Sequence, residues 1–386
     1  MLALSALLGA AGAAATPSAG APPQQGQWQQ LSTSSDQQQQ QQQQPAGPDE
    51  VVDNRQLVWL TQPAGDTEAA GCLDGSPYAF YIWPGNSSEW SVFINGGGWC
   101  LTEELCETRA ATALGSSLGY NLSGAFGPPP GNKNGGPPAY TCQGLDPNCT
   151  RVFMPYCDGS CFTSQRAAHW PVKNSNSSLQ FRGLANLDRT MDVLEARFGL
   201  ASARRLVLQG GSAGGLSTYL HLDRVTERLK RAQQRAAAAS GDTQATTDVP
   251  AGADAVSDVE AGSSGDGGRI QVVGRPVAGF FIDEKKFDPT APTYAENIQY
   301  GVEMFNSTPP LSSACKAKYP GDEWKCWMAT YASPYVREPV FAVQSRFDEF
   351  QLMCLLGAHA WTQGFSVTPE LVFLGPKLFC FVHKIV

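Results

Sequence analysis

A serine flanked by glycines is the feature of this sequence with the clearest chemical meaning. Gly210, Ser212 and Gly214 form a Gly-x-Ser-x-Gly pattern, preceded by the apolar run 206–208 and followed by apolar residues at helical spacing over 222–229. A sharp turn from a strand into a helix exposes such a serine as a nucleophile, and the first N–H groups of the helix stabilise negative charge beside it. The pattern therefore predicts a serine that attacks a carbonyl carbon; the alternative interpretation is a glycine-rich turn without catalytic meaning.

A run of three glycines earlier in the chain fits the same chemistry. Gly96, Gly97 and Gly98 follow the apolar segment 90–94. Glycines after a strand let backbone N–H groups approach a substrate carbonyl, as in the oxyanion loops of esterases. Alone, this run reads as a plain turn, but its place ahead of the serine pattern favours a role in acyl transfer.

The acid of a Ser…Asp…His triad is expected at Asp348. It follows the strand-like run 340–343, and α/β sheets place their sites at the carboxyl ends of strands. An exposed loop aspartate is an equally good interpretation of this residue taken alone.

No histidine fits the expected base. His169 precedes the serine, and His221 lies on the predicted helix directly after it. His359 follows Asp348 by only eleven residues in a segment without clear periodicity, and His383 lies close to the chain end. A structural or incidental role is the better interpretation of each.

The elements that must position these residues alternate between strand and helix. Strands are predicted at 90–94, 206–208, 277–282 and 339–344, and amphipathic helices at 187–198 and 222–229. Such alternation predicts an α/β protein: an α/β-hydrolase-like, mostly parallel sheet flanked by helices in a single domain.

Charge gives little information about partners. The 386 residues carry a formal charge of −8, but residues 240–267 hold six acidic residues and no Lys or Arg, so they supply −6 of it. The rest of the chain is close to neutral, which argues against a nucleic-acid partner. This acidic, Gly/Ser-rich stretch belongs to a predicted low-complexity insertion at 232–268.

Several features predict an exported protein. Residues 1–15 resemble a signal peptide, too short and too Ala/Gly-rich to span a bilayer, and residues 16–50 form a Pro/Gln-rich leader expected to be disordered. We expect no transmembrane segment. Eleven cysteines suit an oxidising compartment, and no spacing indicates a zinc site. Five Asn-x-Ser/Thr sequons point to the same compartment: Asn86, Asn121, Asn148, Asn176 and Asn306.

Cysteine spacing suggests local disulfides but does not decide them. Cys100 with Cys106, Cys157 with Cys161, and Cys315 with Cys326 are plausible pairs. The odd number of cysteines leaves at least one thiol without a partner within the chain.

Together, the motifs resemble the pectin acetylesterase family, which includes the Notum-like carboxylesterases. The matching segments appear in family order from about Val51 to Gln351. They are Cys72-Leu73-Asp74-Gly75-Ser76, Asn95-Gly96-Gly97-Gly98-Trp99-Cys100, Tyr156-Cys157-Asp158-Gly159, Phe181-Arg182-Gly183, Gly211-Ser212-Ala213-Gly214-Gly215, Gly279-Phe280-Phe281, Cys315 to Cys326, Tyr335 and Asp348-Glu349-Phe350-Gln351.

The resemblance implies roles for individual residues. Ser212 is similar to the family nucleophile, Asp348 to the triad acid, and the backbone N–H groups of Gly97, Gly98 and Ala213 to the oxyanion hole. It implies an esterase domain over 51–386 that needs no cofactor or metal and acts as a monomer outside the cell or in the cell wall. The residues of the glycine motif are more similar to those of the plant members of the family, so the expected substrate is an acetylated, pectin-like polysaccharide. A Notum-like lipid deacylase is an alternative.

One departure from the family pattern concerns the base. The family histidine lies in a Cys-flanked motif well downstream of the acid, whereas this sequence is expected to diverge after residue 351 and ends at Val386. A truncated C-terminus would explain both the missing histidine and the odd cysteine. A catalytically impaired homologue that binds acylated glycans is therefore the second hypothesis.

Overall fold

The fold is taken from a computed structural model of the chain. It describes residues 49–52, 54–60, 69–122, 142–173, 175–240, 269–284, 294–348, 350–355 and 379–380. The predicted signal peptide and nearly all of the predicted leader lie outside these residues. Glu50, the last residue assigned to the leader, already belongs to the first strand.

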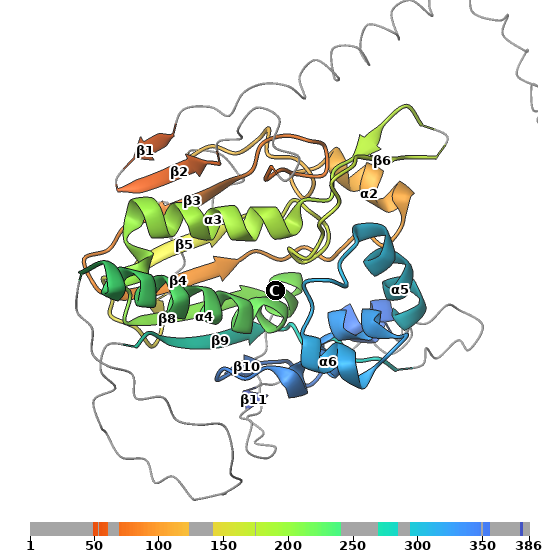
Figure 1. Ribbon diagram of the computed structural model, residues 1–386. Helices are drawn as coiled ribbons and strands as arrows, with labels where there is room; N and C mark the ends of the chain where they lie inside the picture. The colour runs from red at the N-terminus through yellow and green to blue at the C-terminus, as the bar shows by residue number, and fades with distance from the viewer. Residues whose placement is uncertain are drawn as a thin grey trace, which may run out of the picture. The chain divides into compact units, whose positions relative to one another are not determined.

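A nine-stranded sheet forms the centre of the fold, in the order β1-β2-β3-β5-β4-β8-β9-β10-β11 (Figure 1). The strands from β5 to β11 pair in parallel, whereas β1, β2 and β3 form an antiparallel edge. The strands are β1 (Glu50–Val52), β2 (Arg55–Trp59), β3 (Ala79–Trp83), β4 (Glu89–Ile94), β5 (Thr150–Met154), β8 (Arg205–Gly211), β9 (Gln271–Val277), β10 (Ala342–Val343) and β11 (Phe379–Cys380). The prediction of a mostly parallel sheet flanked by helices is confirmed.

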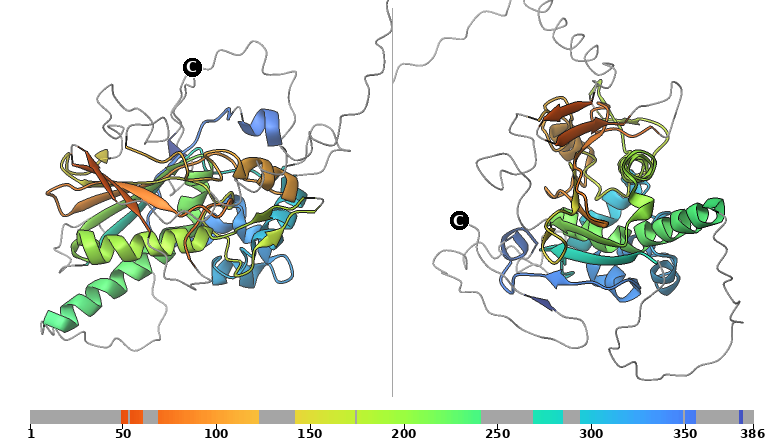
Figure 2. Two further views of the ribbon diagram at one scale, coloured as in Figure 1. Left: turned by 90° about the horizontal axis from the view of Figure 1, so that it is seen from above. Right: turned by 90° about the vertical axis from the view of Figure 1, so that its left-hand side faces the viewer.

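Helices α3 (Gly183–Phe198) and α4 (Ala213–Ser240) lie along one face of this sheet (Figures 1 and 2). The remaining helical segments are α2 (Glu103–Ala110), η3 (Leu200–Ser202), α5 (Tyr294–Phe305), α6 (Ser313–Lys318), η4 (Glu323–Trp327), α7 (Ala329–Ala332), η5 (Ser333–Tyr335) and the π-helical turn η6 (Gln351–Leu355). A short two-stranded sheet pairs β6 (Trp170–Pro171) with β7 (Ser178–Leu179).

Alternation along the strands supplies two apolar cores. In β4, Trp90, Val92 and Ile94 point to the large core shared with α3 and α4, and Phe93 points to a smaller cluster on the opposite face. Successive side chains of a strand project to opposite faces, so both faces of this central strand are covered. This explains why the segment 90–94 reads as a continuous apolar run.

The prediction of a strand over 277–282 is wrong, because the observed strand ends where the predicted one begins. β9 runs from Gln271 to Val277, and Ala278 has φ 49°, a left-handed conformation that ends the strand. The following Phe281 is apolar because it packs into the core, not because it lies in the sheet. The strand predicted at 339–344 is reduced to β10, with one isolated bridge between Val340 and Gly274.

Helix α4 extends into the predicted low-complexity insertion. It ends at Ser240, and Gln233 still binds the core: its amide donates to Ala203 O at 2.8 Å, and its oxygen accepts from Ile270 N at 3.0 Å. Residues 241–268, which carry the acidic run, lie outside the described residues.

Four disulfides join the described cysteines. Cys100–Cys106 and Cys315–Cys326 are bonded as expected, and Cys142–Cys149 adds a third short loop. The suggested Cys157–Cys161 pair is wrong: Cys157 bonds Cys72 across 85 residues, and Cys161 is a buried free thiol. Short spacing favours pairing of Cys157 with Cys161, but the fold brings Cys157, after β5, next to Cys72, before β3.

The surface features agree with an oxidising compartment. Four disulfides are typical of extracellular proteins. The sequon asparagines are exposed, apart from Asn121, which is partly buried. Within the described chain, none of the helices combines the length and apolar character that crossing a membrane requires.

Candidate active site

Ser212 occupies a strained turn between β8 and α4. Its φ is 56°, a left-handed value that is uncommon for a residue other than glycine. The turn is fixed on both sides, since Ser212 N donates to Val277 O at 2.8 Å and Ser212 O accepts from Leu216 N at 3.0 Å. The residue is exposed. The geometry is that of a nucleophile elbow, at the N-terminal end of a long helix whose dipole favours negative charge.

The glycine at position 214 is required by the approach of α4 to β4. A Cβ placed there would lie 2.1 Å from Ile94 O and 2.8 Å from Asn95 O. No side chain fits between these backbones, whereas a Cβ at Gly211 would meet nothing within 4 Å. Gly214 is therefore required for packing, because backbone atoms of Ile94 and Asn95 occupy the space in which a side chain would lie.

The glycine loop after β4 lies directly beside the serine. A Cβ on Gly96 would come within 2.2 Å of Gly211 O and 3.2 Å of Ser212 Cβ. Gly97 and Gly98 have φ values of 138° and 66°, which glycine adopts without strain. Ala213, the first residue of α4, completes the set of backbone positions predicted from the sequence. The structure thus brings the two glycine motifs together at the carboxyl ends of adjacent strands β4 and β8.

Asp348 lies after β10, at the same edge of the sheet. β9 separates β8 from β10, and Val343 pairs with Val277, the residue whose carbonyl also accepts from Ser212 N. The Asp348 carboxylate accepts from Gln344 Nε2 at 2.9 Å and from the backbone N of Gln351 at 3.0 Å. These bonds hold the side chain in one orientation.

Two glutamines that were not singled out as site residues connect the acid to the segment after β9. Gln344 Oε1 accepts from Phe280 N at 3.1 Å, and Gln351 bonds both Ile282 N and Phe280 O. Both glutamine side chains are buried. The motif Asp348-Glu349-Phe350-Gln351 contained the signal for Gln351; Gln344 is visible only in the tertiary structure.

Neither described histidine is bonded to Ser212. His169 is exposed before β6. His221 is buried in α4, with Nε2 2.9 Å from Cys161 O; because a carbonyl only accepts, this nitrogen carries the hydrogen. Burial lowers the pKa of His221 to about 4, so it is a neutral structural group at pH 7. His359 and His383 lie outside the described residues.

An aromatic cluster adjoins the glycine loop. The ring of Trp99 contacts those of Phe281, Tyr294, Trp327 and Phe350, with centroid separations between 4.8 and 6.1 Å. Three of these contacts are edge-on, the arrangement that fills space well between aromatic rings.

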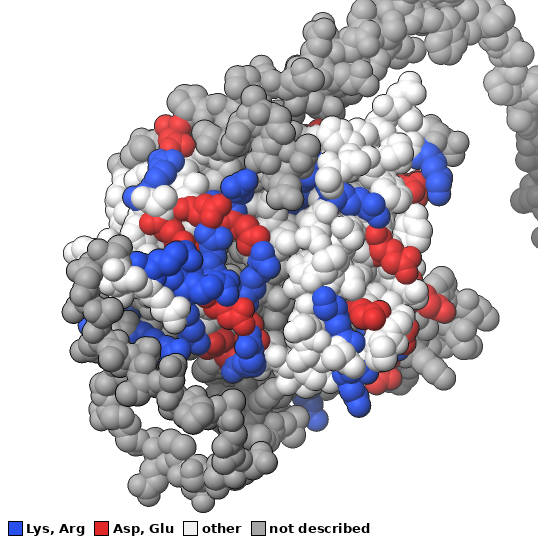
Figure 3. Space-filling model, viewed as in Figure 1, with Lys and Arg blue, Asp and Glu red and all other residues white. Residues whose placement is uncertain are grey.

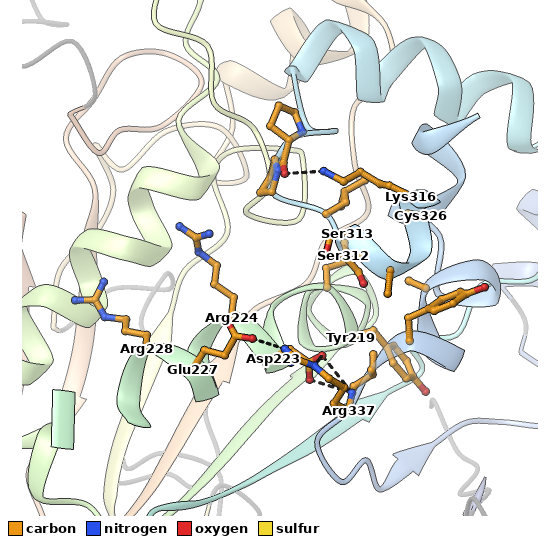
Figure 4. A pocket seen from close by; sticks show the side chains of 18 of the residues that line it. Tyr219, Asp223, Arg224, Glu227, Arg228, Ser312, Ser313, Lys316, Cys326 and Arg337 are labelled. Carbon is orange, nitrogen blue, oxygen red and sulfur yellow. Dashed lines mark hydrogen bonds and ion pairs between the residues drawn. The ribbon is translucent and has the colours of Figure 1, made fainter. Parts of the chain in front are cut away.

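A separate cavity of about 780 Å³ lies along the outer side of α4, between this helix and the segments around α6 and η5 (Figure 4). Its arginines are bonded to carboxylates, for example Arg224 to Asp188, and Arg337 to Asp223 and Glu227, whereas Lys316 donates to the backbone carbonyls of Thr308 and Pro309. Figure 3 shows the same interleaving of basic and acidic groups over α3 and α4. This face therefore carries no strong charge of one sign, as the near-neutral sequence predicts.

Metal ligands are not clustered in the described part of the chain. No group of three or more His, Cys, Asp or Glu residues there is arranged to hold an ion. The candidate site instead consists of the Ser212 hydroxyl, the glycine loop beside it and the Asp348 carboxylate.

The arrangement of strand, nucleophile turn and helix defines an α/β-hydrolase fold. The solved structure of the Wnt deacylase Notum from Drosophila shares this fold, with a TM-score of 0.56 and 23% sequence identity, over 81% of this chain and 76% of that chain. The family model described as pectinacetylesterase matches residues 52–252 and 267–366, so the chain belongs to the pectin acetylesterase family.

Relatives from both plants and animals match. The human palmitoleoyl-protein carboxylesterase NOTUM is 29% identical over 296 residues, which cover 73% of this chain and 49% of the relative. Pectin acetylesterase 4 of Arabidopsis thaliana is 28% identical over 310 residues, or 78% and 62% of the two chains. The chain thus spans about half to two thirds of the length of these curated relatives.

The family match covers most of the chain but has a gap and a C-terminal limit. The match omits residues 253–266, inside the predicted insertion, and it extends to residue 366. The matched range therefore extends past Gln351, the last residue of the short motifs, and includes His359.

Proposed function

We propose that this chain is a serine carboxylic ester hydrolase that removes O-acetyl groups from pectin or a similar polysaccharide. Ser212 Oγ attacks the ester carbonyl, the bond to the sugar oxygen breaks, and the serine proton ends on that oxygen. Water then cleaves the acyl-serine, releases acetate and restores the hydroxyl. Gly97, Gly98 and Ala213 N–H groups stabilise the negative oxygen of each tetrahedral intermediate, and Asp348 is the acid of the triad.

The observation that carries this proposal is the turn at Ser212. A non-glycine residue held at φ 56° costs free energy, and such strain persists where the surrounding structure fixes it. Here it is fixed by hydrogen bonds to Val277 in β9 and to Leu216 in α4, and Gly96 of the glycine loop lies beside it. Strained turns of this kind cluster at active sites because they expose a reactive group.

The aromatic cluster supports a short acyl group. The ring of Trp99, next to Gly98, contacts the rings of Phe281, Trp327 and Phe350, so aromatic side chains occupy part of the space beside the loop. A long fatty acyl chain would need an apolar pocket there, whereas an acetyl group would not. The plant relatives named pectin acetylesterase agree with this choice of substrate.

The decisive experiment compares acetate release from acetylated pectin by the wild type, Ser212→Ala and the control Ser202→Ala, an exposed serine in η3. We expect release by the wild type and the control, and background from Ser212→Ala. Equal background from all three would exclude hydrolysis; retention on acetylated but not deacetylated pectin would then identify a glycan-binding homologue.

A series of p-nitrophenyl esters tests the acyl specificity. We expect acetate to be cleaved faster than octanoate, and Trp99→Ala to shift the preference toward the longer chain by opening the aromatic cluster. A wild type that prefers octanoate, or that deacylates a palmitoleoylated peptide, would instead indicate the lipid deacylase activity for which the human relative is named.

A further inference from the structure

The loop that carries Gly97 and Gly98 belongs to neither a helix nor a strand. Residues 95–100 have irregular backbone, and the two glycines adopt left-handed conformations without side chains that could anchor them. Loss of precise geometry in an oxyanion loop weakens stabilisation of the transition state strongly, since the donors act only at the correct distance. Some other group must hold this loop.

Arg109, in the last turn of α2, makes the contacts needed. Its Nη1 donates to Gly97 O at 2.8 Å, and its Nε donates to Leu114 O at 2.9 Å. The Leu114 side chain in turn lies against Gly97, where a Cβ would come within 2.6 Å of Leu114 Cδ2. The guanidinium thus bonds both the glycine loop and the turn after α2, and these two segments also contact each other through Leu114 and Gly97.

The surroundings of the guanidinium fix its position. Its carbon lies 5.0 Å from the centre of the Tyr156 ring, and the disulfide Cys100–Cys106 connects the glycine loop to α2. Asp158 is fully buried nearby; burial raises the pKa of its carboxyl, and the charge of Arg109 acts in the opposite direction. A planar, permanently charged group with two directed donors suits this place better than a lysine would.

Donation to Gly97 O affects the next N–H directly. Gly97 C=O and Gly98 N–H belong to one planar peptide unit, and in the trans form they point in opposite directions. A guanidinium bonded to the carbonyl therefore sets the direction of Gly98 N–H and polarises it, since hydrogen bonds in a chain strengthen one another. We propose that Arg109 is a positioning residue that orients and polarises the Gly97–Gly98 peptide for stabilisation of the oxyanion.

This inference rests on the proposed ester hydrolysis, and its test starts from Arg109→Met compared with Arg231→Met, an exposed arginine on α4. We expect Arg109→Met to lower kcat about 10²-fold with KM changed less than about twofold, as for loss of one oxyanion donor. Arg231→Met should match the wild type. Arg109→Lys, which keeps one donor, should recover about tenfold of the loss.

Chemical rescue separates positioning from a general folding defect. Guanidinium ion at millimolar concentration should raise kcat of Arg109→Ala and leave the wild type unchanged. The proposal is overturned if Arg109→Met keeps kcat within threefold of the wild type, if the loss appears in KM alone, or if neither lysine nor guanidinium restores activity.

A fluorophosphonate probe distinguishes failure of this inference from failure of the proposed function. The probe bonds Ser212 Oγ with loss of fluoride and requires the oxyanion hole but no turnover. If the wild type reacts with the probe yet cleaves no ester, hydrolysis is excluded, and slower labelling of Arg109→Met than of Arg231→Met still supports the inference. Equal labelling rates, or no labelling of the wild type, would overturn it.

Discussion

The two sides of the candidate site, with the proposed nucleophile Ser212 on one side and the proposed acid Asp348 on the other, are held in different ways. Ser212 follows a seven-residue strand that pairs along its length with β4 and β9, and backbone groups fix its turn. Asp348 follows the two-residue strand β10, which pairs with β9 at a single position, and the Gln344 side chain and the Gln351 backbone N–H bond its carboxylate. Backbone pairing resists single substitutions, whereas side-chain bonds do not, so the two sides should respond differently to mutation.

The largest effect is expected from removing the charge on the acid side. Asp348→Asn should lower kcat by about 10⁴-fold with KM little changed, the loss expected when the acid of a serine triad becomes a neutral amide. Initial rates on p-nitrophenyl acetate measure this, with the exposed Asp322→Asn as control. A variant within threefold of the wild type would remove Asp348 from the triad and leave the two sides of the site functionally unrelated.

On the Ser212 side, substitutions at the close backbone contact between α4 and β4 should lower the free energy of unfolding. Gly214→Ala forces a methyl group against Ile94 O, so we expect the free energy of unfolding to fall by about 3 kcal/mol or more, despite the better helix propensity of alanine. Gly211→Ala, with open space around it, should change it by less than about 0.5 kcal/mol. Urea denaturation measures both. Equal stability of the two variants would contradict the packing of α4 on β4.

His221 should support the nucleophile side through stability rather than catalysis. Because its pKa is about 4 in the folded protein and about 6.5 when unfolded, the unfolded chain binds the extra proton first, and stability falls as pH drops through this window. Between pH 8 and pH 5 the loss is about 2 kcal/mol from this group.

Comparing urea unfolding of the wild type with His221→Gln at both pH values isolates this contribution. The glutamine keeps an N–H donor for Cys161 O but does not titrate, so the free energy of unfolding of the wild type relative to the variant should fall by about 2 kcal/mol from pH 8 to pH 5. An unchanged difference would mean that the pKa of His221 is not lowered in the folded protein. Loss of activity at pH 8 in a folded variant would instead indicate that His221 takes part in catalysis.

The smallest effect should come from the supports of the acid. Gln344→Leu removes one hydrogen bond to Asp348 and one to Phe280 N, and we expect kcat to fall about tenfold, near 1.4 kcal/mol. Gln299→Leu, on the exposed face of α5, is the matched control. Steady-state kinetics of both variants would show whether orientation of the acid depends on this side chain; equal rates would mean that the Gln351 backbone suffices.

Local patterns were sufficient for the elements around the serine. The apolar runs at 90–94 and 206–208 and the helical spacing after Ser212 identified β4, β8 and α4, because buried parallel strands and amphipathic helices leave direct periodic signals. The segment 277–282 failed for the same reason: an apolar run looks alike whether it pairs in a sheet or packs under aromatic side chains.

The sequence by itself was enough to predict the nucleophile, the glycine loop and the acid, since each prediction depends on a short pattern with a local physical cause. Only the tertiary structure decided how they are supported. Cys72 bonds Cys157 across 85 residues, Gln344 links Asp348 to Phe280, and Arg109 reaches Gly97 from another element. These contacts join residues that are distant along the chain, and no periodicity records which side chains folding will bring together.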